Sequence, residues 1–305
     1  GRATDPAPER GLARHGPYDG RVPSAPPPTF HHRDFTAEAL VAAKGDVTVS
    51  VCLPARDEAA TVGAIVDTIR TRLVDDVPLV DELLVVDDHS SDRTAAAAAD
   101  AGAAVVRTTD GQGKGEALWT SMLASKGDLV VWCDADVREF DTAFVTGLLG
   151  PLLTDPTIGF VKGFYERPLN DRQEGGGRVT ELVARPLVAL LFPELDGVVQ
   201  PLSGEYAGRR EVLERLPFVQ GYGVDLGLLI DVHRLVGLAG IAQVDLGVRH
   251  HRNRPLAELS PQAAAVMATT DHRQPAPCSS RPPSRVLPST TRAAVATARA
   301  NCQPP

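Results

Sequence analysis

Strand-like and helix-like segments alternate over residues 47–134, and this alternation limits the folds that the chain can adopt. The strand-like segments are runs of β-branched and apolar residues, whereas the segments between them repeat apolar residues at helical spacing. The expected strands are 47–53, 82–88, 104–107 and 128–134, and the expected helices are 57–73, 91–102 and 114–126. Helices that join successive strands place those strands parallel in one sheet. The predicted fold class is therefore α/β, with a mostly parallel sheet covered by helices.

The α/β pattern continues less regularly after residue 134. Further helices are expected at 142–153, 178–192 and 224–237, further strands at 158–165 and 241–246, and a short helix before the first strand at 35–45. In sheets of this class, ligands bind at the carboxyl ends of the strands. The segments that directly follow the expected strands are therefore the first place to look for a functional site.

The two ends of the chain differ in composition from its middle. Residues 1–34 are rich in Pro, Gly and Arg, and residues 268–305 carry Pro, Arg and Ser without apolar periodicity. Segments of this kind cannot bury a core, so we expect a disordered arm at 1–34 and a disordered or atypical tail at 268–305. Residues 35–140 and 141–267 are then expected to form the two halves of the folded part.

Composition and charge exclude several classes of protein. The chain has 305 residues and a net charge of -8, which argues against general binding to nucleic acid. No apolar run reaches the roughly 18 residues of a membrane-spanning helix, and the N-terminus lacks the apolar core of a signal peptide. The four cysteines have no regular spacing, so neither a disulfide framework nor a zinc site is expected. We therefore expect a cytoplasmic protein without membrane insertion.

Two acids that are separated by one small residue, Asp134 and Asp136, follow the strand at 128–134. Like charges at this spacing repel each other, so either a cation lies between them or both face water. The strands at 47–53 and 82–88 also end in polar and acidic segments, "PARDEAA" and "DDHSSDRT". Because strand ends of a parallel sheet meet at one edge, we expect the three acidic clusters to lie close together.

A glycine-rich loop with one lysine, "DGQGKGEA", precedes the helix at 114–126. Such a loop offers backbone N–H groups and a cation to a phosphate. It lacks the G-x-x-x-x-G-K-[ST] spacing of a P-loop, so an ordinary P-loop ATPase is not expected. The loop and the acids together predict a phosphate-containing ligand at this edge of the sheet.

These motifs together resemble a known family. "LPARDEAATVG", "VVDDHSSDRT", "GKGEAL" and "DAD", in this order, resemble the nucleotide-binding half of GT-A glycosyltransferases. Later segments are similar to the retaining glucosyl-3-phosphoglycerate synthase family, namely "GGGRVTELVARPL", "LSGEYAGRRE", "GYGVDLGLLID" and "HHRNRPL". The resemblance implies a GT-A type, Rossmann-like sheet in which 35–140 binds a nucleotide sugar and 141–267 binds the acceptor. It also implies a homodimer.

The resemblance implies a retaining glucosyltransferase. It would move glucose from an NDP-glucose, with UDP-glucose favoured, to the 2-hydroxyl of 3-phosphoglycerate, with Mg²⁺ or Mn²⁺ as cofactor. This reaction is the first step of methylglucose lipopolysaccharide synthesis. The alternatives are a mannosyl-3-phosphoglycerate synthase, a polyprenyl-phosphate glycosyltransferase, or a non-catalytic nucleotide-sugar sensor.

The family's donor and metal positions map onto the first half of the chain and one late histidine. The residues implied to bind the donor are Pro54, Ala55, Arg56, Glu58, Asp88, Ser90, Gly113, Lys114, Asp134, Ala135 and Asp136. Asp136 and His251 are implied as metal ligands, and a carboxylate suits a hard cation. Plainer roles stay open, because Glu58 and Ser90 could be helix-start residues and His251 could be one of two surface histidines.

The implied acceptor site belongs to the second half of the chain. Its implied residues are Gly177, Arg178, Val179, Thr180 and Asn253. The residues implied to be catalytic are Asp136, Lys114 and Asp225. Asp225 stands where the family often carries Glu, one methylene longer, so a catalytic and a structural role both stay open. No carboxylate is placed as an obvious nucleophile, and a same-face displacement without a covalent glycosyl-enzyme is expected.

Overall fold

The computed structural model describes residues 26–109, 111–166, 177–249, 256–271 and 280–281. These residues form an eight-stranded sheet in the order β1-β9-β6-β7-β5-β2-β3-β4. Its strands are β1 Thr29–His31, β2 Val49–Ala55, β3 Glu82–Asp87, β4 Ala104–Arg107, β5 Leu129–Trp132, β6 Phe160–Glu166, β7 Tyr206–Arg209 and β9 Ile241–Val248. Neighbouring strands are parallel except for β7, which runs antiparallel to both β5 and β6. The predicted α/β class and mostly parallel sheet are confirmed.

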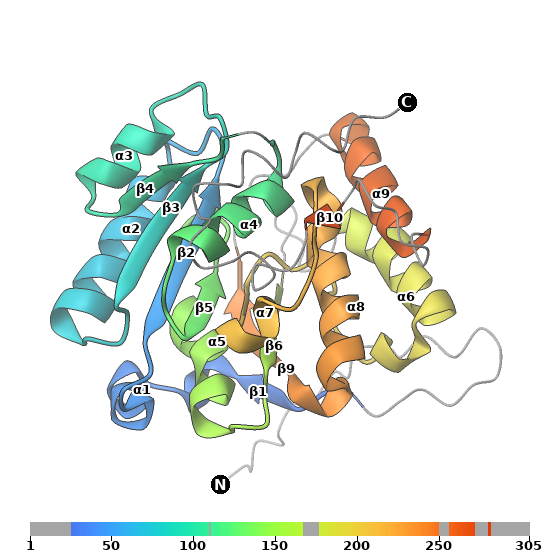
Figure 1. Ribbon diagram of the computed structural model, residues 1–305, viewed down its shortest axis with the longest axis horizontal. Coiled ribbons are helices and arrows are strands. Elements are labelled where there is room, and N and C mark those ends of the chain that lie inside the picture. The colour runs from blue at the N-terminus through green and yellow to red at the C-terminus, as the bar shows by residue number, and fades with distance from the viewer. Residues whose placement is uncertain (1–25, 110, 167–176, 250–255, 272–279, 282–305) are drawn as a thin grey trace, which may run out of the picture.

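The helices of the first half lie in the segments predicted from the apolar periodicity, although α2 begins at Val62 and not at residue 57. They are α1 Ala37–Lys44, α2 Val62–Ile69, which continues as the π-helical segment η2 Arg70–Asp76, α3 Thr94–Asp100 and α4 Lys114–Ala124. The second half adds α5 Ala143–Thr154, α6 Arg185–Leu191, α7 Arg210–Leu213, α8 Val224–Val236 and α9 Leu256–Asp271. In Figure 1, α2 and α3 lie beside β3 and β4, and α8 lies between α6 and the central strands.

Helices cover both faces of the sheet. Successive strand residues point to opposite faces, so each strand contributes side chains to two cores. On β5, Leu129 and Val131 join a core with residues of α1, α2 and α5, whereas Val130 and Trp132 join a second core with residues of α4, α6 and α8. Burial on both faces explains why the strand segments read as continuous apolar runs.

The helix expected at 178–192 is divided at a proline. The π-helical segment η3 Thr180–Ala184 leads directly into α6, and Pro186 lies in the first turn of α6. A proline is tolerated there because the first N–H groups of a helix have no partner within it. The proline therefore marks a helix start inside a continuous helical path.

The arm expected at 1–34 is wrong for its last nine residues. Within it, β1 pairs in parallel with β9, and η1 His32–Asp34 is a turn of 3₁₀ helix. The Gln243 side chain donates a hydrogen bond to Thr29 Oγ1 at 3.0 Å, and Phe30 packs against the core. The Pro-rich composition did not indicate this edge strand. The strand forms because it pairs with the edge of β9, which lies over two hundred residues later in the chain. Residues 1–25 lie outside the described residues.

The tail expected from residue 268 also starts too early. Helix α9 runs unbroken to Asp271, and Thr270 is only 4% exposed. The two residues of β10 Ser280–Arg281 pair antiparallel with β8 Phe218–Val219. Packing of α9 against α8 and the 3₁₀ turn η5 Gly221–Gly223 holds a segment whose polar composition predicted no structure. The remaining tail residues, 272–279 and 282–305, lie outside the described residues.

Among the described residues, no helix combines the length and the apolar character that crossing a membrane requires.

The contribution of β1 can be measured by truncation. A chain that begins at residue 36 lacks β1, η1 and two half-buried phenylalanines, Phe30 and Phe35, whose ring centroids lie 5.8 Å apart. Compared with a chain that begins at residue 26, we expect it to lose roughly 1.5–3 kcal/mol of stability, the contribution of about one fully buried Phe side chain. Equal melting temperatures of the two purified chains would contradict a stabilising role for β1.

Candidate functional site

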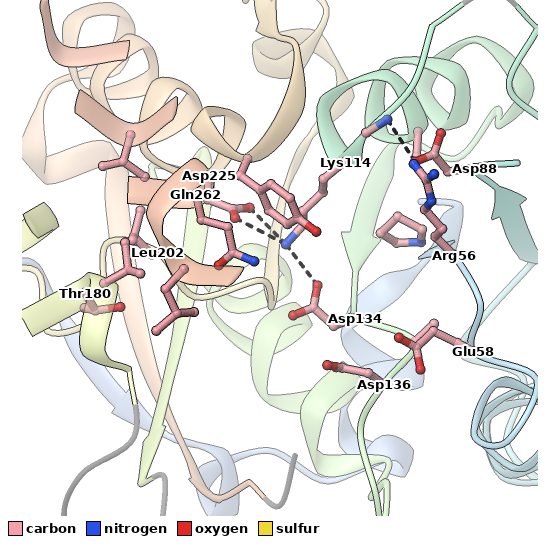
Figure 2. Close-up of a pocket in the computed structure, with 18 of the residues that line it drawn as sticks. Arg56, Glu58, Asp88, Lys114, Asp134, Asp136, Thr180, Leu202, Asp225 and Gln262 are labelled. Atoms are coloured by element: carbon pink, nitrogen blue, oxygen red, sulfur yellow. Dashed lines mark hydrogen bonds and ion pairs between the residues drawn. The ribbon is translucent and has the colours of Figure 1, made fainter. Parts of the chain in front are cut away.

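A cavity of about 310 Å³ lies at the carboxyl ends of β2 and β5. Figure 2 shows that it has two ends, with Arg56 and Asp88 at one, Thr180 and Leu202 at the other, and Lys114 and Asp134 between them. The lining residues predicted from sequence are Pro54, Ala55, Arg56, Glu58, Asp88, Gly113, Lys114, Asp134, Ala135, Asp136, Gly177, Arg178, Val179, Thr180 and Asp225. The structure thus gathers both halves of the predicted site around one cavity.

Three predicted residues are not part of this lining. Ser90 lies outside the lining, and its hydroxyl accepts a hydrogen bond from the backbone N–H of Asp57 at 3.0 Å. Helix α3 begins only at Thr94, so Ser90 holds the β2 loop rather than capping that helix. His251 and Asn253 lie outside the described residues.

Asp88 organises the end of the cavity that contains Arg56. Its buried carboxylate accepts a hydrogen bond from the backbone N–H of Gly113 at 2.8 Å and lies 3.6 Å from the Arg56 guanidinium. Gly113 has φ +99°, a conformation that a residue with a side chain rarely adopts, and a Cβ there would lie 3.1 Å from Gly221 Cα. The glycine-rich loop is therefore fastened to β3 through Asp88, and its position is fixed before any ligand binds.

The Asp134–Asp136 pair is neutralised by the protein itself. The Arg249 guanidinium is only 3% exposed, and its Nη2 lies 3.1 Å from Asp134 Oδ2 and 2.6 Å from Asp136 Oδ1. Lys114 Nζ lies 2.9 Å from Asp134 Oδ1. The two acids therefore tolerate each other because two built-in cations lie against them, whereas the sequence had suggested a bound metal for this task.

Lys114 bridges the two halves of the chain. It is the first residue of α4, and its Nζ lies 2.9 Å from Asp134 Oδ1 and 3.1 Å from Asp225 Oδ1 (Figure 2). Burial alone would lower the pKa of Lys114, but the two carboxylates outweigh it and raise that pKa. Burial alone would likewise raise the pKa of Asp134, but Lys114 and Arg249 hold it well below its usual value. Both groups are therefore charged at neutral pH.

Asp225 has a second side-chain partner besides Lys114. It is the second residue of α8, and the buried hydroxyl of Tyr206 donates a hydrogen bond to Asp225 Oδ1 at 3.0 Å. The aromatic ring of Tyr206 belongs to β7, in register with Trp132 of β5. The carboxylate of Asp225 is thus fixed between a lysine and a tyrosine on the wall of the cavity.

A buried cluster behind the acids was missed by the sequence analysis. Glu205, which immediately precedes β7, lies 3.2 Å from Arg249 Nη1, and the same nitrogen donates to Tyr165 Oη at 2.5 Å. Burial raises the pKa of Glu205. The segment "LSGEYAG" had been noted only as a family resemblance. An acid directly before the short segment "YAG" was the available signal for this cluster.

The cavity suits a ligand with charge at its centre and polar groups at both ends. Cations and acids are paired along its middle, backbone N–H groups begin α4 beside it, and Arg178 lies at the far end. The described residues include no cluster of three or more His, Cys, Asp or Glu that could hold a metal alone. A metal at Asp134 and Asp136 would therefore need oxygens from the ligand, or His251.

This chain resembles several known proteins. A sequence profile for "Glycosyl transferase family 2" matches residues 50–216. The chain belongs to this family. It is 51% identical over 252 residues to the glucosyl-3-phosphoglycerate synthase of Mycolicibacterium smegmatis, covering 79% of this chain and 82% of that protein. The alignment of this glycosyltransferase with its relative thus spans about four fifths of either chain.

Solved structures show the same similarity. One is the glucosyl-3-phosphoglycerate synthase of Mycobacterium tuberculosis in complex with Mn²⁺, UDP-glucose and phosphoglyceric acid, with a TM-score of 0.78 and 46% identity, covering 86% of this chain and 99% of that chain. Another is the mannosyl-3-phosphoglycerate synthase of Rubrobacter xylanophilus, with a TM-score of 0.76 and 44% identity. The match covers 81% of this chain and 80% of that chain. The predicted GT-A fold, glycosyltransferase class and resemblance to glucosyl-3-phosphoglycerate synthases are confirmed.

The close approach of Gly204 to Asp134 can be tested. A Cβ at position 204 would overlap both carboxylate oxygens of Asp134. We expect Gly204→Ala to displace that carboxylate from Lys114 and Arg249 and to lower activity by about a hundredfold, since misplacement by about 1 Å can cost that much. Thermal unfolding should show that the variant is folded. Gly63→Ala, where the added Cβ makes ordinary contacts, is the matched control. Equal activities of the two variants would contradict the positioning of Asp134 by Gly204.

Proposed function

We propose that this chain is a retaining glucosyltransferase that moves glucose from UDP-glucose to the 2-hydroxyl of 3-phosphoglycerate. The observation that carries the proposal is one cavity with the Asp134–Asp136 pair and Lys114 between two ends of different character. The end at Arg56 and Asp88 is built by the first half of the chain, which we propose binds the nucleotide, and the end at Arg178 and Thr180 by the second half. A donor and an acceptor that meet at the central charges would fill this arrangement.

The chemistry of the acids fits Mg²⁺ or Mn²⁺. Structures of the Mycobacterium tuberculosis synthase hold Mn²⁺ or Mg²⁺ together with UDP or UDP-glucose. Mg²⁺ is usually bound through one or two carboxylates plus substrate phosphates, and Asp134 and Asp136 supply two carboxylates at the cavity. We propose that Asp136 and His251 hold the metal, which when bound stabilises the negative charge of the departing nucleoside diphosphate.

The residues at the centre of the cavity orient the reactants and balance their charge. Lys114 begins α4 beside the glycine-rich loop, so its ammonium and the neighbouring N–H groups face the expected position of the diphosphate. The carboxylates of Asp134 and Asp225 are both held by Lys114. An acid fixed in an ion pair is poorly suited to attack a sugar carbon. We therefore propose a same-face displacement in which the departing phosphate assists the incoming hydroxyl.

The far end of the cavity is suited to a small anion. 3-Phosphoglycerate carries a carboxylate and a phosphate on either side of its hydroxyl, so it needs an anion-binding site beyond the donor. Gly177, Arg178, Val179 and Thr180 line the cavity there. A guanidinium can bind phosphate or carboxylate with two parallel hydrogen bonds. We propose that these four residues, with Asn253, bind the acceptor.

Three further parts of the proposal rest on the family resemblance. We propose that the enzyme acts in the cytoplasm, that it is a homodimer, and that its reaction is the first step of methylglucose lipopolysaccharide synthesis. Each can be tested separately, by fractionation, by light scattering of the purified protein, and by the lipopolysaccharide content of a deletion strain.

A mannosyl donor is the second candidate, because the Rubrobacter xylanophilus structure that is 44% identical is a mannosyl-3-phosphoglycerate synthase. A donor panel separates the candidates. UDP-glucose, GDP-glucose, ADP-glucose and GDP-mannose are each incubated with 3-phosphoglycerate, with Mg²⁺, with Mn²⁺ or with EDTA. We expect the fastest transfer from UDP-glucose and none in EDTA. Faster transfer from GDP-mannose would favour the second candidate, and transfer that is undiminished in EDTA would contradict the metal site.

The acceptor site predicts a selective kinetic effect of Arg178. A charge-assisted contact contributes roughly 1.5–3 kcal/mol, so Arg178→Ala should raise the KM for 3-phosphoglycerate by about ten- to a hundredfold and leave the KM for the donor unchanged. Steady-state kinetics with each substrate varied in turn measure both values. Arg72→Ala is the control, because Arg72 is exposed on η2 and pairs with Asp76. A raised donor KM with an unchanged acceptor KM would show that the two ends of the cavity have been assigned in the wrong order.

A further inference from the structure

A second lysine lies behind the cavity. Lys162 is in the middle of β6, and it is only 1% exposed. It does not line the cavity, and none of the roles assigned above involves it. Burying an ammonium group is costly unless it finds compensating partners. The contacts of this lysine must therefore compensate for its burial.

The contacts of Lys162 lead to the functional residues on the cavity wall. Its Nζ lies 4.3 Å from the ring centroid of Tyr206, within the range of a cation–π interaction. The same Nζ donates a hydrogen bond to the backbone oxygen of Asp225 at 3.4 Å. Tyr206 in turn donates to Asp225 Oδ1, and Asp225 pairs with Lys114. Lys162 thus touches Asp225, whose carboxylate lies beside Lys114, and Tyr206, which donates a hydrogen bond to that carboxylate.

The two lysines flank one aromatic residue. Lys114 Nζ lies 5.9 Å from the Tyr206 ring centroid, and Lys162 Nζ lies 4.3 Å from it. Lys114 faces the cavity, where Figure 2 shows it between Asp134 and Asp225. Loss of the charge behind the ring would weaken the hold on Tyr206 and on the first turn of α8. Asp225 and Lys114 would then lose their fixed geometry.

We propose that Lys162, in its charged form, is a positioning residue that fixes Tyr206 and Asp225 and thereby holds Lys114 in place for sugar transfer. The proposal rests on the proposed function for its kinetic readout, but the contacts themselves do not depend on the identity of the substrates.

The charge of Lys162 changes in an accessible pH range. Burial lowers its pKa to about 8, against the opposing attraction of Asp225. The charged and titratable groups around it are Asp225 of α8, Lys114 of α4, Tyr206 and Glu205 at β7 and Asp134 after β5, and the neighbour in register on β9 is the uncharged Gln243. Lys162 is therefore mostly charged at pH 7 and mostly neutral at pH 9.

The kinetic test compares three enzymes over pH 6.5–10. In the native enzyme, kcat should fall as pH rises through about 8. Lys162→Met keeps the length and apolar stem but removes the charge, so kcat should be about ten- to a hundredfold lower at pH 7, and the fall near pH 8 should be absent. The KM values should change little, because Lys162 does not line the cavity. Lys44→Met is the matched control, since Lys44 is 7% exposed and pairs with Asp81 far from Tyr206.

A second measurement needs no substrate. Because the folded-state pKa of Lys162 lies below the ordinary value of 10.5, the unfolded chain binds more protons between pH 8 and 10.5. The melting temperature of the native enzyme relative to Lys162→Met should therefore rise over that range and be lowest below pH 8. If no donor and acceptor support turnover, the proposed function fails, and this measurement still shows whether Lys162 titrates in the fold.

Several results would overturn the proposal. A native kcat that stays flat from pH 7 to 10 would do so even if Lys162→Met fails to fold. A Lys162→Met enzyme with native kcat and the native fall of kcat near pH 8 would also overturn it. The same holds if Lys44→Met lowers kcat as much as Lys162→Met does. If Lys162→Met changed only the melting temperature, with no pH dependence relative to the native enzyme, Lys162 would be a packing residue and the positioning role would be wrong.

Discussion

Charge compensation among buried side chains is the constraint on which the site depends. A buried ion that loses its partner destabilises the fold strongly, so each member of such a cluster fixes its neighbours. Here one connected set combines both signs, namely Asp136, Arg249, Glu205, Asp134, Lys114, Asp225 and Lys162, which joins the set through the backbone oxygen of Asp225. The side chains that line the cavity are therefore held by one another and by Glu205 behind them, and the geometry exists before a ligand arrives.

The sheet order brings these charges together. Asp134 follows β5, and Glu205 precedes β7, which inserts antiparallel between β5 and β6. Arg249 follows β9, on the other side of β6. An all-parallel order in which β6 directly adjoined β5 would leave no strand to carry Glu205 and Tyr206 beside the acids. The reversed strand is thus what joins the first half of the chain to the second half at one charged centre.

The sequence predicted those parts of the structure that depend on local residue patterns. Alternating apolar runs and helical periodicity placed β2 to β5 and their helices, and strand ends placed Asp134, Asp136 and Asp88 at one edge. It could not predict β1 or the end of α9, because distant partners stabilise both segments against their composition. Arg249 was missed for a related reason, because no local pattern distinguishes an arginine that is buried by tertiary pairing from one that is solvated. Lys162 interrupts the apolar run of the strand predicted at 158–165, and that interruption was the available signal.

The position of Asp225 narrows the role of this residue. The resembling family often has Glu there, and the shorter Asp raised the question whether it still reaches the acceptor. In the structure both of its oxygens are engaged, with Lys114 near each of them and Tyr206 on Oδ1. We therefore propose that Asp225 acts on the substrates indirectly, through Lys114, whose ammonium it contacts with both oxygens.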